Sequence, residues 1–254
     1  MNNTRDLLDK FLGPLQDAAA GGNAATGQSL GGGLDAVKNA AGQVDLQSLL
    51  SGRSGMVAAA AAGGLAGLLL GGKKPRKLAG SALKLGGIAL VGGLAYKAWQ
   101  DWQANKAPEP APSPADAPLA LPSPDGTAFA PDSAADENDL SRDLIRAMIA
   151  AAKADGHIDN EERARIASQL DAVGLSDEQK AFVAEELAKP LDVSAVAASG
   201  TTPKKAAEVY AASLLAIDPD GPAERGYLAM LAARLNLDPQ LVAHLHANTK
   251  AVVG

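Results

Sequence analysis

The organisation of this chain follows from a glycine-rich apolar stretch, residues 54–77, which reads SGMVAAAAAGGLAGLLLGGKKPRK. Residues 54–72 carry no charge, and a helix of that length would roughly match the thickness of a hydrocarbon core. A second apolar stretch, 78–96, follows the basic turn and contains one charged residue, Lys84. The pattern predicts a glycine-rich, membrane-associated helical hairpin over residues 53–106.

Small residues recur every four positions in the first arm of this hairpin, at Ala59, Gly63, Gly67 and Gly71. They lie on one helix face, where small side chains let helices approach closely in lipid. In a soluble helix each glycine would cost about 0.8–1 kcal/mol relative to alanine. We therefore expect Gly63, Gly67 and Gly71 to pack helices together, and a homo-oligomer to form through this face. A flexible Ala/Gly linker and a soluble helical hairpin are the alternatives.

Basic and aromatic side chains mark the predicted membrane interface, because lysines and amphipathic rings favour the headgroup level. The expected interface residues are Lys73, Lys74, Arg76, Lys77, Tyr96, Trp99 and Trp102. The last three belong to a chain with only eight aromatic residues in total. Membrane lipid is therefore an expected partner. Packing of these rings within a short soluble helix is the alternative.

The side of the membrane on which the termini and the C-terminal domain lie depends on how many segments span the bilayer. Two spans would place the basic turn in the cytoplasm and both termini outside. A single span over 54–72 would place the more basic flank, and with it the C-terminal domain, in the cytoplasm. Lys84 weakens the second span. We expect a bacterial inner-membrane protein with a cytoplasmic C-terminal domain.

Three further regions flank the hairpin. Residues 1–52 are expected to be flexible, with a short amphipathic helix whose apolar face carries Leu7, Leu8, Phe11, Leu12 and Leu15. Residues 107–135 form a Pro/Ala-rich linker, with eight of the fifteen prolines of the chain between positions 107 and 133. Residues 136–254 hold 12 basic and 19 acidic residues, a net charge of −7, and form an acidic head.

The head is expected to be an all-helical bundle. Apolar residues recur with helical period, and cap residues mark several helix starts. Ser176 and Gln179 form a capping-box pattern, and Thr202 precedes Pro203 as a cap followed by proline at the first helical position. The expected helices cover 139–154, 160–173, a segment from Ser176, a short turn at 192–198, 202–217, 222–235 and 240–249.

One loop of the head carries a dense polar cluster, Lys153-Ala-Asp-Gly-His-Ile-Asp-Asn-Glu-Glu-Arg163. The carboxylates of Asp155, Asp159 and Glu162 are candidate ligands for a hard cation, Ca²⁺ or Mg²⁺, although the spacing is not that of an EF-hand. Helix capping by Asp159 or Asn160 is the alternative. No other cofactor is indicated.

Composition excludes several classes of function. The chain has no cysteine, so thiol chemistry and thiolate metal sites are excluded. Its net charge of −6 argues against general nucleic-acid binding. No Ser-His-Asp arrangement or phosphate-binding glycine loop after a strand occurs, and we expect a protein that is not an enzyme.

The loop 153–163, the later stretch from Ile217 to Leu228 and the glycine-rich stretch 68–80 resemble the YebE-like bacterial inner-membrane proteins, which carry a TerB-like helical domain related to tellurite-resistance proteins. The resemblance implies a compact helical head on a membrane anchor, without established enzymatic activity, and metal binding at Asp155, Asp159 and Glu162. Pro219 and Pro222 depart from the pattern.

Two functions are consistent with these features. The first is a non-enzymatic, membrane-anchored TerB-like module in envelope or stress-related interactions, responsive to a divalent cation. The second is a structural, oligomerising scaffold whose acidic head recruits a protein partner without metal.

Overall fold

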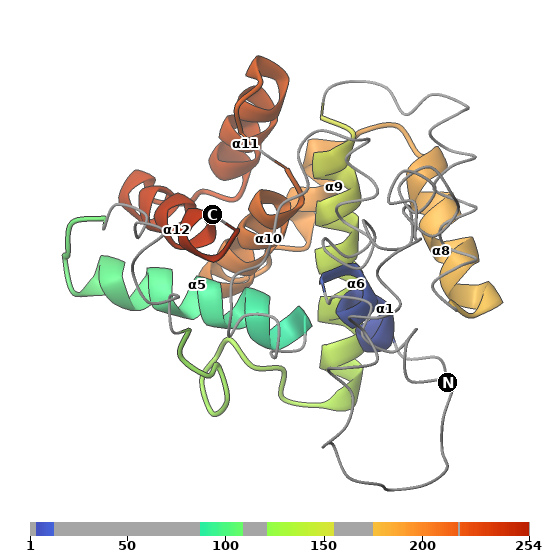
Figure 1. Cartoon of the computed structure of the whole chain (residues 1–254), viewed down its shortest axis with the longest axis horizontal. Coiled ribbons are helices and arrows are strands. Elements are labelled where there is room, and N and C mark those ends of the chain that lie inside the picture. Colours follow the sequence, from blue (N-terminus) through green and yellow to red (C-terminus); the bar gives the residue numbers. More distant parts are fainter. Residues whose placement is uncertain (1–3, 13–86, 109–120, 155–174, 218, 254) are drawn as a thin grey trace, which may run out of the picture.

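The computed structural model describes residues 4–12, 87–108, 121–154, 175–217 and 219–253. All regular structure in these ranges is helical, which confirms the all-α prediction for this part of the chain (Figure 1). The helices are α1 (Thr4–Leu12), α5 (Gly87–Gln103), α6 (Ala134–Ala152), α8 (Asp177–Ala188), α9 (Val193–Ala198), α10 (Pro203–Ala216), α11 (Pro222–Arg234) and α12 (Pro239–Val253).

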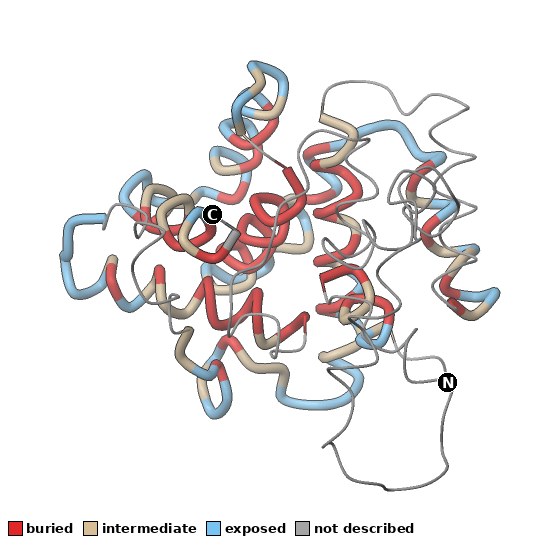
Figure 2. The backbone as a smooth tube through the Cα atoms, in the orientation of Figure 1, coloured by how far each residue is buried: buried red, intermediate tan, exposed pale blue. Residues whose placement is uncertain are grey.

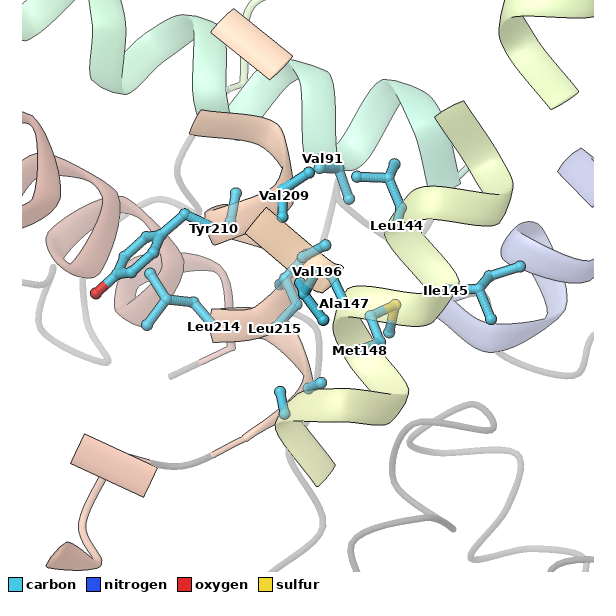
Figure 3. Close-up of a cluster of buried hydrophobic side chains, with 14 of the residues drawn as sticks. Val91, Leu144, Ile145, Ala147, Met148, Val196, Val209, Tyr210, Leu214 and Leu215 are labelled. Carbon is cyan, nitrogen blue, oxygen red and sulfur yellow. The ribbon is translucent and has the colours of Figure 1, made fainter. Parts of the chain in front are cut away.

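Helix α10 lies at the centre of the core. Every residue from Ala206 to Ala216 is buried, because α6, α5 and α12 all pack against this helix. Figure 2 shows the buried backbone concentrated in α10, α6 and α5. Val209 and Leu214 of α10 lie in one apolar cluster with Leu144 and Met148 of α6 and Val91 of α5 (Figure 3). Small aliphatic side chains from distant parts of the sequence therefore form one core.

Local cap chemistry defines several helix starts, as the sequence predicts. The Ser176 hydroxyl accepts a hydrogen bond from the Gln179 backbone N–H, and the Gln179 side chain accepts one from the Ser176 N–H. This reciprocal capping box begins α8. Thr202 accepts from the Lys205 N–H, and Pro203 occupies the first turn of α10. The helix expected over residues 160–173 lies outside the described residues.

The second arm of the predicted membrane hairpin is not supported. Residues 87–96 of that arm belong to α5, which packs against α12, α10 and α1. Leu90, Val91 and Leu94 are fully buried there. The apolar face that suggested lipid contact is covered by helices of the same chain. None of the described helices combines the length and the apolar character that a bilayer crossing requires.

Segments that the sequence assigned to separate regions share this core. Helix α1, from the region expected to be flexible, packs against α6 and α5. Residues 121–130, from the expected linker, lie along α5 at two glycines. A Cβ atom at Gly92 would lie 2.8 Å from the Phe129 carbonyl oxygen, and one at Gly93 would lie 3.0 Å from that of Pro122. Glycine is needed at both positions because this backbone passes so close.

Candidate functional site

The predicted metal ligands Asp155, Asp159 and Glu162 lie outside the described residues. The chain enters that loop after Lys153, whose ammonium group donates to the Glu186 carbonyl oxygen at 3.2 Å and to the Lys189 carbonyl. Among the described residues, no three His, Asp or Glu side chains are grouped so that they could hold a metal ion. The metal site stays a prediction.

The predicted interface residues fall into two groups. The glycines and the basic turn lie outside the described residues; they are Gly63, Gly67, Gly71, Lys73, Lys74, Arg76 and Lys77. The three rings are half-buried on α5. The Phe129 ring centroid lies 5.6 Å from that of Tyr96 and 6.0 Å from that of Trp99, which stacks edge-on with Trp102 at 5.0 Å. These rings make an aromatic cluster within the chain.

The helices that flank segment 13–86, α1 and α5, contact each other where α1 passes the start of α5. The Gly87 N–H, at the start of α5, donates to the Asp9 carboxylate of α1 at 2.5 Å. A Cβ atom at Gly87 would lie 2.9 Å from Cγ of Leu8, so glycine permits this close crossing. The Arg5 guanidinium lies 2.7 Å from the Glu137 carboxylate of α6 and ties α1 to the bundle. The described residues on either side of segment 13–86 therefore lie close together in the bundle.

An open cleft of about 950 Å³ lies where α5, α6, α10 and residues 126–132 come together. We call it the Glu208 cleft. Its lining residues are Trp99, residues 126–132, Asp136, Leu140, residues 202–205 and Glu208. One wall is aromatic and formed by Trp99 and Phe129. The Lys204 ammonium lies 5.9 Å from the Phe129 ring centroid, so this wall already holds a cation of the chain itself.

Glu208 is the unusual residue of this cleft. Its side chain lies on the central helix α10 and the residue is only 2% exposed. Its Oε1 atom has no hydrogen-bond partner among the described residues. Burial raises the pKa of the Glu208 carboxyl to about 8, and the nearby Lys205 ammonium opposes this only in part. A buried acid with an oxygen that lacks a hydrogen-bond partner is costly for the fold, and such groups are frequent at functional sites.

Two other acids that are at least partly buried, Asp101 and Glu186, are paired with cations. Burial raises the pKa of Asp101, but hydrogen bonds from Lys97 at 2.8 Å and Lys106 at 3.1 Å outweigh it and hold the pKa below its ordinary value. A second acid that is paired with cations, Glu186, lines a groove of about 370 Å³ between α6, α8 and α9. There Glu186 accepts from Arg146 and Lys189, and its pKa is lowered despite burial. The paired cations explain why Asp101 and Glu186 can be charged in the fold. Glu208 forms no such ion pair among the described residues, and its Oε1 atom has no hydrogen-bond partner there.

Reasoning from the sequence did not identify Glu208. A usable indication exists, because Glu208 is the one charged residue in the run from Ala206 to Ile217. A helix that is apolar on all sides is buried, and a charge within it is buried too. Tyr210 and Tyr227 are buried in the core and form hydrogen bonds with His246 at 2.9 Å and Ser213 at 3.3 Å respectively.

Comparisons with known proteins identify the family but not an activity. Residues 55–249 match the family described as "Protein of unknown function (DUF533)". A protein of Yersinia enterocolitica, called "Uncharacterized protein in ampR 5'region", is 34% identical over 94 residues, which cover 37% of this chain and 68% of the relative. No solved structure matches. The matched range includes both the glycine-rich stretch and the helical head, and the chain belongs to the DUF533 family.

Proposed function

We propose that this protein is a non-enzymatic, TerB-like helical module that attaches to the bacterial inner membrane from one side, through residues 54–77. The observation that carries the proposal is the hydrogen bond between Asp9 and Gly87, which joins α1 and α5, the helices on either side of segment 13–86. A single crossing would leave α1 and α5 on opposite sides of the membrane, where they could not pack together. The chain between α1 and α5 must therefore cross the membrane twice, or another even number of times, or not at all.

The predicted second arm is too short for a second full crossing. Residues 87–96 of that arm belong to α5, so only residues 78–86 remain. A helix of that length reaches only about 14 Å, against a hydrocarbon core of about 30 Å. Attachment without crossing fits better, with residues 54–72 entering the bilayer and the basic turn at the headgroups. Each of the four basic residues of the turn contributes about 1 kcal/mol of attraction to anionic lipid.

The absence of cysteine permits a direct test with single-cysteine variants. Asn2→Cys, Ala107→Cys and Gly254→Cys should be labelled from the same side by a membrane-impermeant maleimide, in intact spheroplasts and in inverted vesicles. We expect this side to be the cytoplasm. Labelling of Asn2→Cys and Ala107→Cys from opposite sides would refute one-sided attachment, and a soluble chain in fractionation would refute attachment itself.

Lipid contact itself is tested by flotation of the full chain with vesicles. Binding should be stronger with anionic than with neutral vesicles and should weaken with salt. Replacement of Lys73, Lys74, Arg76 and Lys77 by Gln should remove this preference. A preference that survives the four substitutions would assign the attraction to another part of the chain.

A response to divalent cations is the finer part of the proposal and rests on the predicted ligands Asp155, Asp159 and Glu162. Millimolar Ca²⁺ or Mg²⁺ should raise the melting temperature of the full chain, and Asp155→Ala should abolish that rise. An equal rise in Asp155→Ala would exclude these ligands.

The alternative function is an oligomerising scaffold. In that case Gly67→Leu should dissociate oligomers in detergent, measured by light scattering, because leucine blocks the close approach of helices. An oligomer that is unaffected by Gly67→Leu would argue against the scaffold.

A further inference from the structure

The Glu208 cleft combines three features that point to a ligand of one chemical class. A carboxyl group that is 2% exposed borders an open cavity, and its Oε1 atom has no partner among the described residues. A buried carboxylate is stable only when a cation or hydrogen-bond donors compensate it. The cleft is large enough for a small ligand to supply that compensation, since small-molecule sites occupy about 300–1,000 Å³.

The aromatic wall favours a cation with an organic body. Trp99 and Phe129 stand edge to face on one side of the cleft, and Lys204 already places its ammonium over the Phe129 ring. Aromatic faces attract ammonium groups through the ring quadrupole and offer apolar contact to the attached carbon atoms. A bare metal ion has no carbon atoms and would gain no apolar contact from this wall.

The remaining charges around Glu208 come from two elements. Asp132 and Asp136 stand on one rim, ahead of and at the start of α6, and Lys204 and Lys205 stand on α10. With Glu208 ionised these five groups carry a net charge of −1, so one added positive charge neutralises the cleft. Helix α5 contributes the uncharged Trp99 to the lining.

We propose that this cleft binds a small organic ammonium ion, with the Glu208 carboxylate as its counter-ion and the Trp99–Phe129 wall against its alkyl part. The site is independent of membrane attachment and does not use the predicted metal ligands. Because Glu208 must be ionised to act as the counter-ion, binding below pH 8 is coupled to release of a proton.

Calorimetric titration of the full chain with butylammonium chloride tests the proposal, with 1-butanol and sodium butyrate as the neutral and anionic controls. We expect saturable binding of the ammonium ion alone in the millimolar range. Titration at about pH 7 in two buffers of different protonation enthalpy should show release of about one proton for each ion bound. Absence of binding, or equal binding of 1-butanol, would overturn the proposal.

Two variants and a control assign the site. Glu208→Gln should weaken binding at least about tenfold and abolish proton release, because the amide cannot act as counter-ion. Lys204→Met should strengthen binding about two- to fivefold by removing the competing cation, a gain that misfolding cannot imitate. The exposed control Glu178→Gln should bind like the natural chain. Unchanged affinity in Glu208→Gln, or weaker binding in Lys204→Met, would refute the assignment.

Discussion

Replacement of Glu208 by Gln should stabilise the fold at neutral pH. Glutamine keeps the shape and the hydrogen-bonding capacity of the protonated acid but never ionises. In the unfolded chain the carboxyl titrates near its ordinary value of 4.5, whereas in the folded chain burial raises the pKa to about 8. The unfolded chain therefore gives up its proton first as the pH rises, and the natural protein loses stability over this interval.

The size of the effect follows from the two pKa values. Each pH unit between them costs about 1.4 kcal/mol of unfolding free energy. At pH 7 the natural chain has lost up to about 3 kcal/mol relative to pH 4.5, and the loss approaches about 5 kcal/mol above pH 8. The contribution is fully present below the unfolded pKa and is lost as the pH rises through the folded one. Glu208→Gln removes this dependence.

Urea denaturation of the natural chain and of Glu208→Gln at several pH values measures the difference in unfolding free energy directly. Because all other titrating groups are common to both proteins, the difference isolates Glu208. It should favour the variant and grow from about pH 5 to about pH 8, then level off. The exposed control Glu178→Gln should differ from the natural chain by less than about 0.5 kcal/mol throughout. A variant less stable than the natural chain at pH 7, or a difference independent of pH, would refute the account of Glu208.

Four further substitutions test the packing of the helical bundle by thermal and urea unfolding. Gly92→Ala should cost about 1–3 kcal/mol, because its Cβ would lie 2.8 Å from a backbone oxygen, whereas Gly226→Ala, in open space on α11, should gain up to about 1 kcal/mol. If Gly92→Ala is neutral, the segment 121–130 does not pack there as described. Thr202→Ala should cost about 1 kcal/mol through loss of the α10 cap, and no loss would mean that the cap is dispensable. Asp101→Asn should cost about 1–3 kcal/mol at pH 7. Because its two lysine partners hold the pKa below the ordinary 3.8, that cost should shrink as the pH falls below this value, and a pH-independent cost would refute the pairing.

The features that the sequence predicts well are those encoded locally. The capping box of Ser176 and Gln179 needs only residues three positions apart, and it begins α8 as expected. Thr202 with Pro203 marks the start of α10 for the same reason. Helical periodicity likewise predicts an all-helical head, because one face of each helix must be buried wherever its partner comes from.

The features that the sequence does not reveal depend on contacts between distant segments. The apolar face of α5 has the same composition whether lipid or α12 covers it, so Leu90 and Leu94 cannot distinguish the two environments. Phe129, from the segment 121–130, packs against Tyr96 and Trp99 of α5, and Trp99 packs against Trp102, so that the three predicted interface rings belong to one cluster. The Glu208 cleft has the same origin, since its walls come from α5, α6, α10 and a proline-rich segment that no local pattern relates.

Glycine placement on α5 shows how one sequence pattern arises both in membrane helices and in a packed helical bundle. Small residues on a helix indicate that another backbone passes close by, and they do so in lipid and in water alike. On α5, Gly87 admits α1, Gly92 admits the backbone at Phe129 and Gly93 admits the backbone at Pro122. Each of these contacts lies within the helical bundle of the chain itself. A glycine stripe therefore indicates that another backbone lies close to the helix, but it does not distinguish lipid from water as the surrounding medium. Lipid contact of the stripe at 59–71 is a prediction that the flotation experiment tests. The shared location of α1 and α5 adds a constraint of a different kind, because two segments that pack together must lie on one side of any membrane that the chain between them enters.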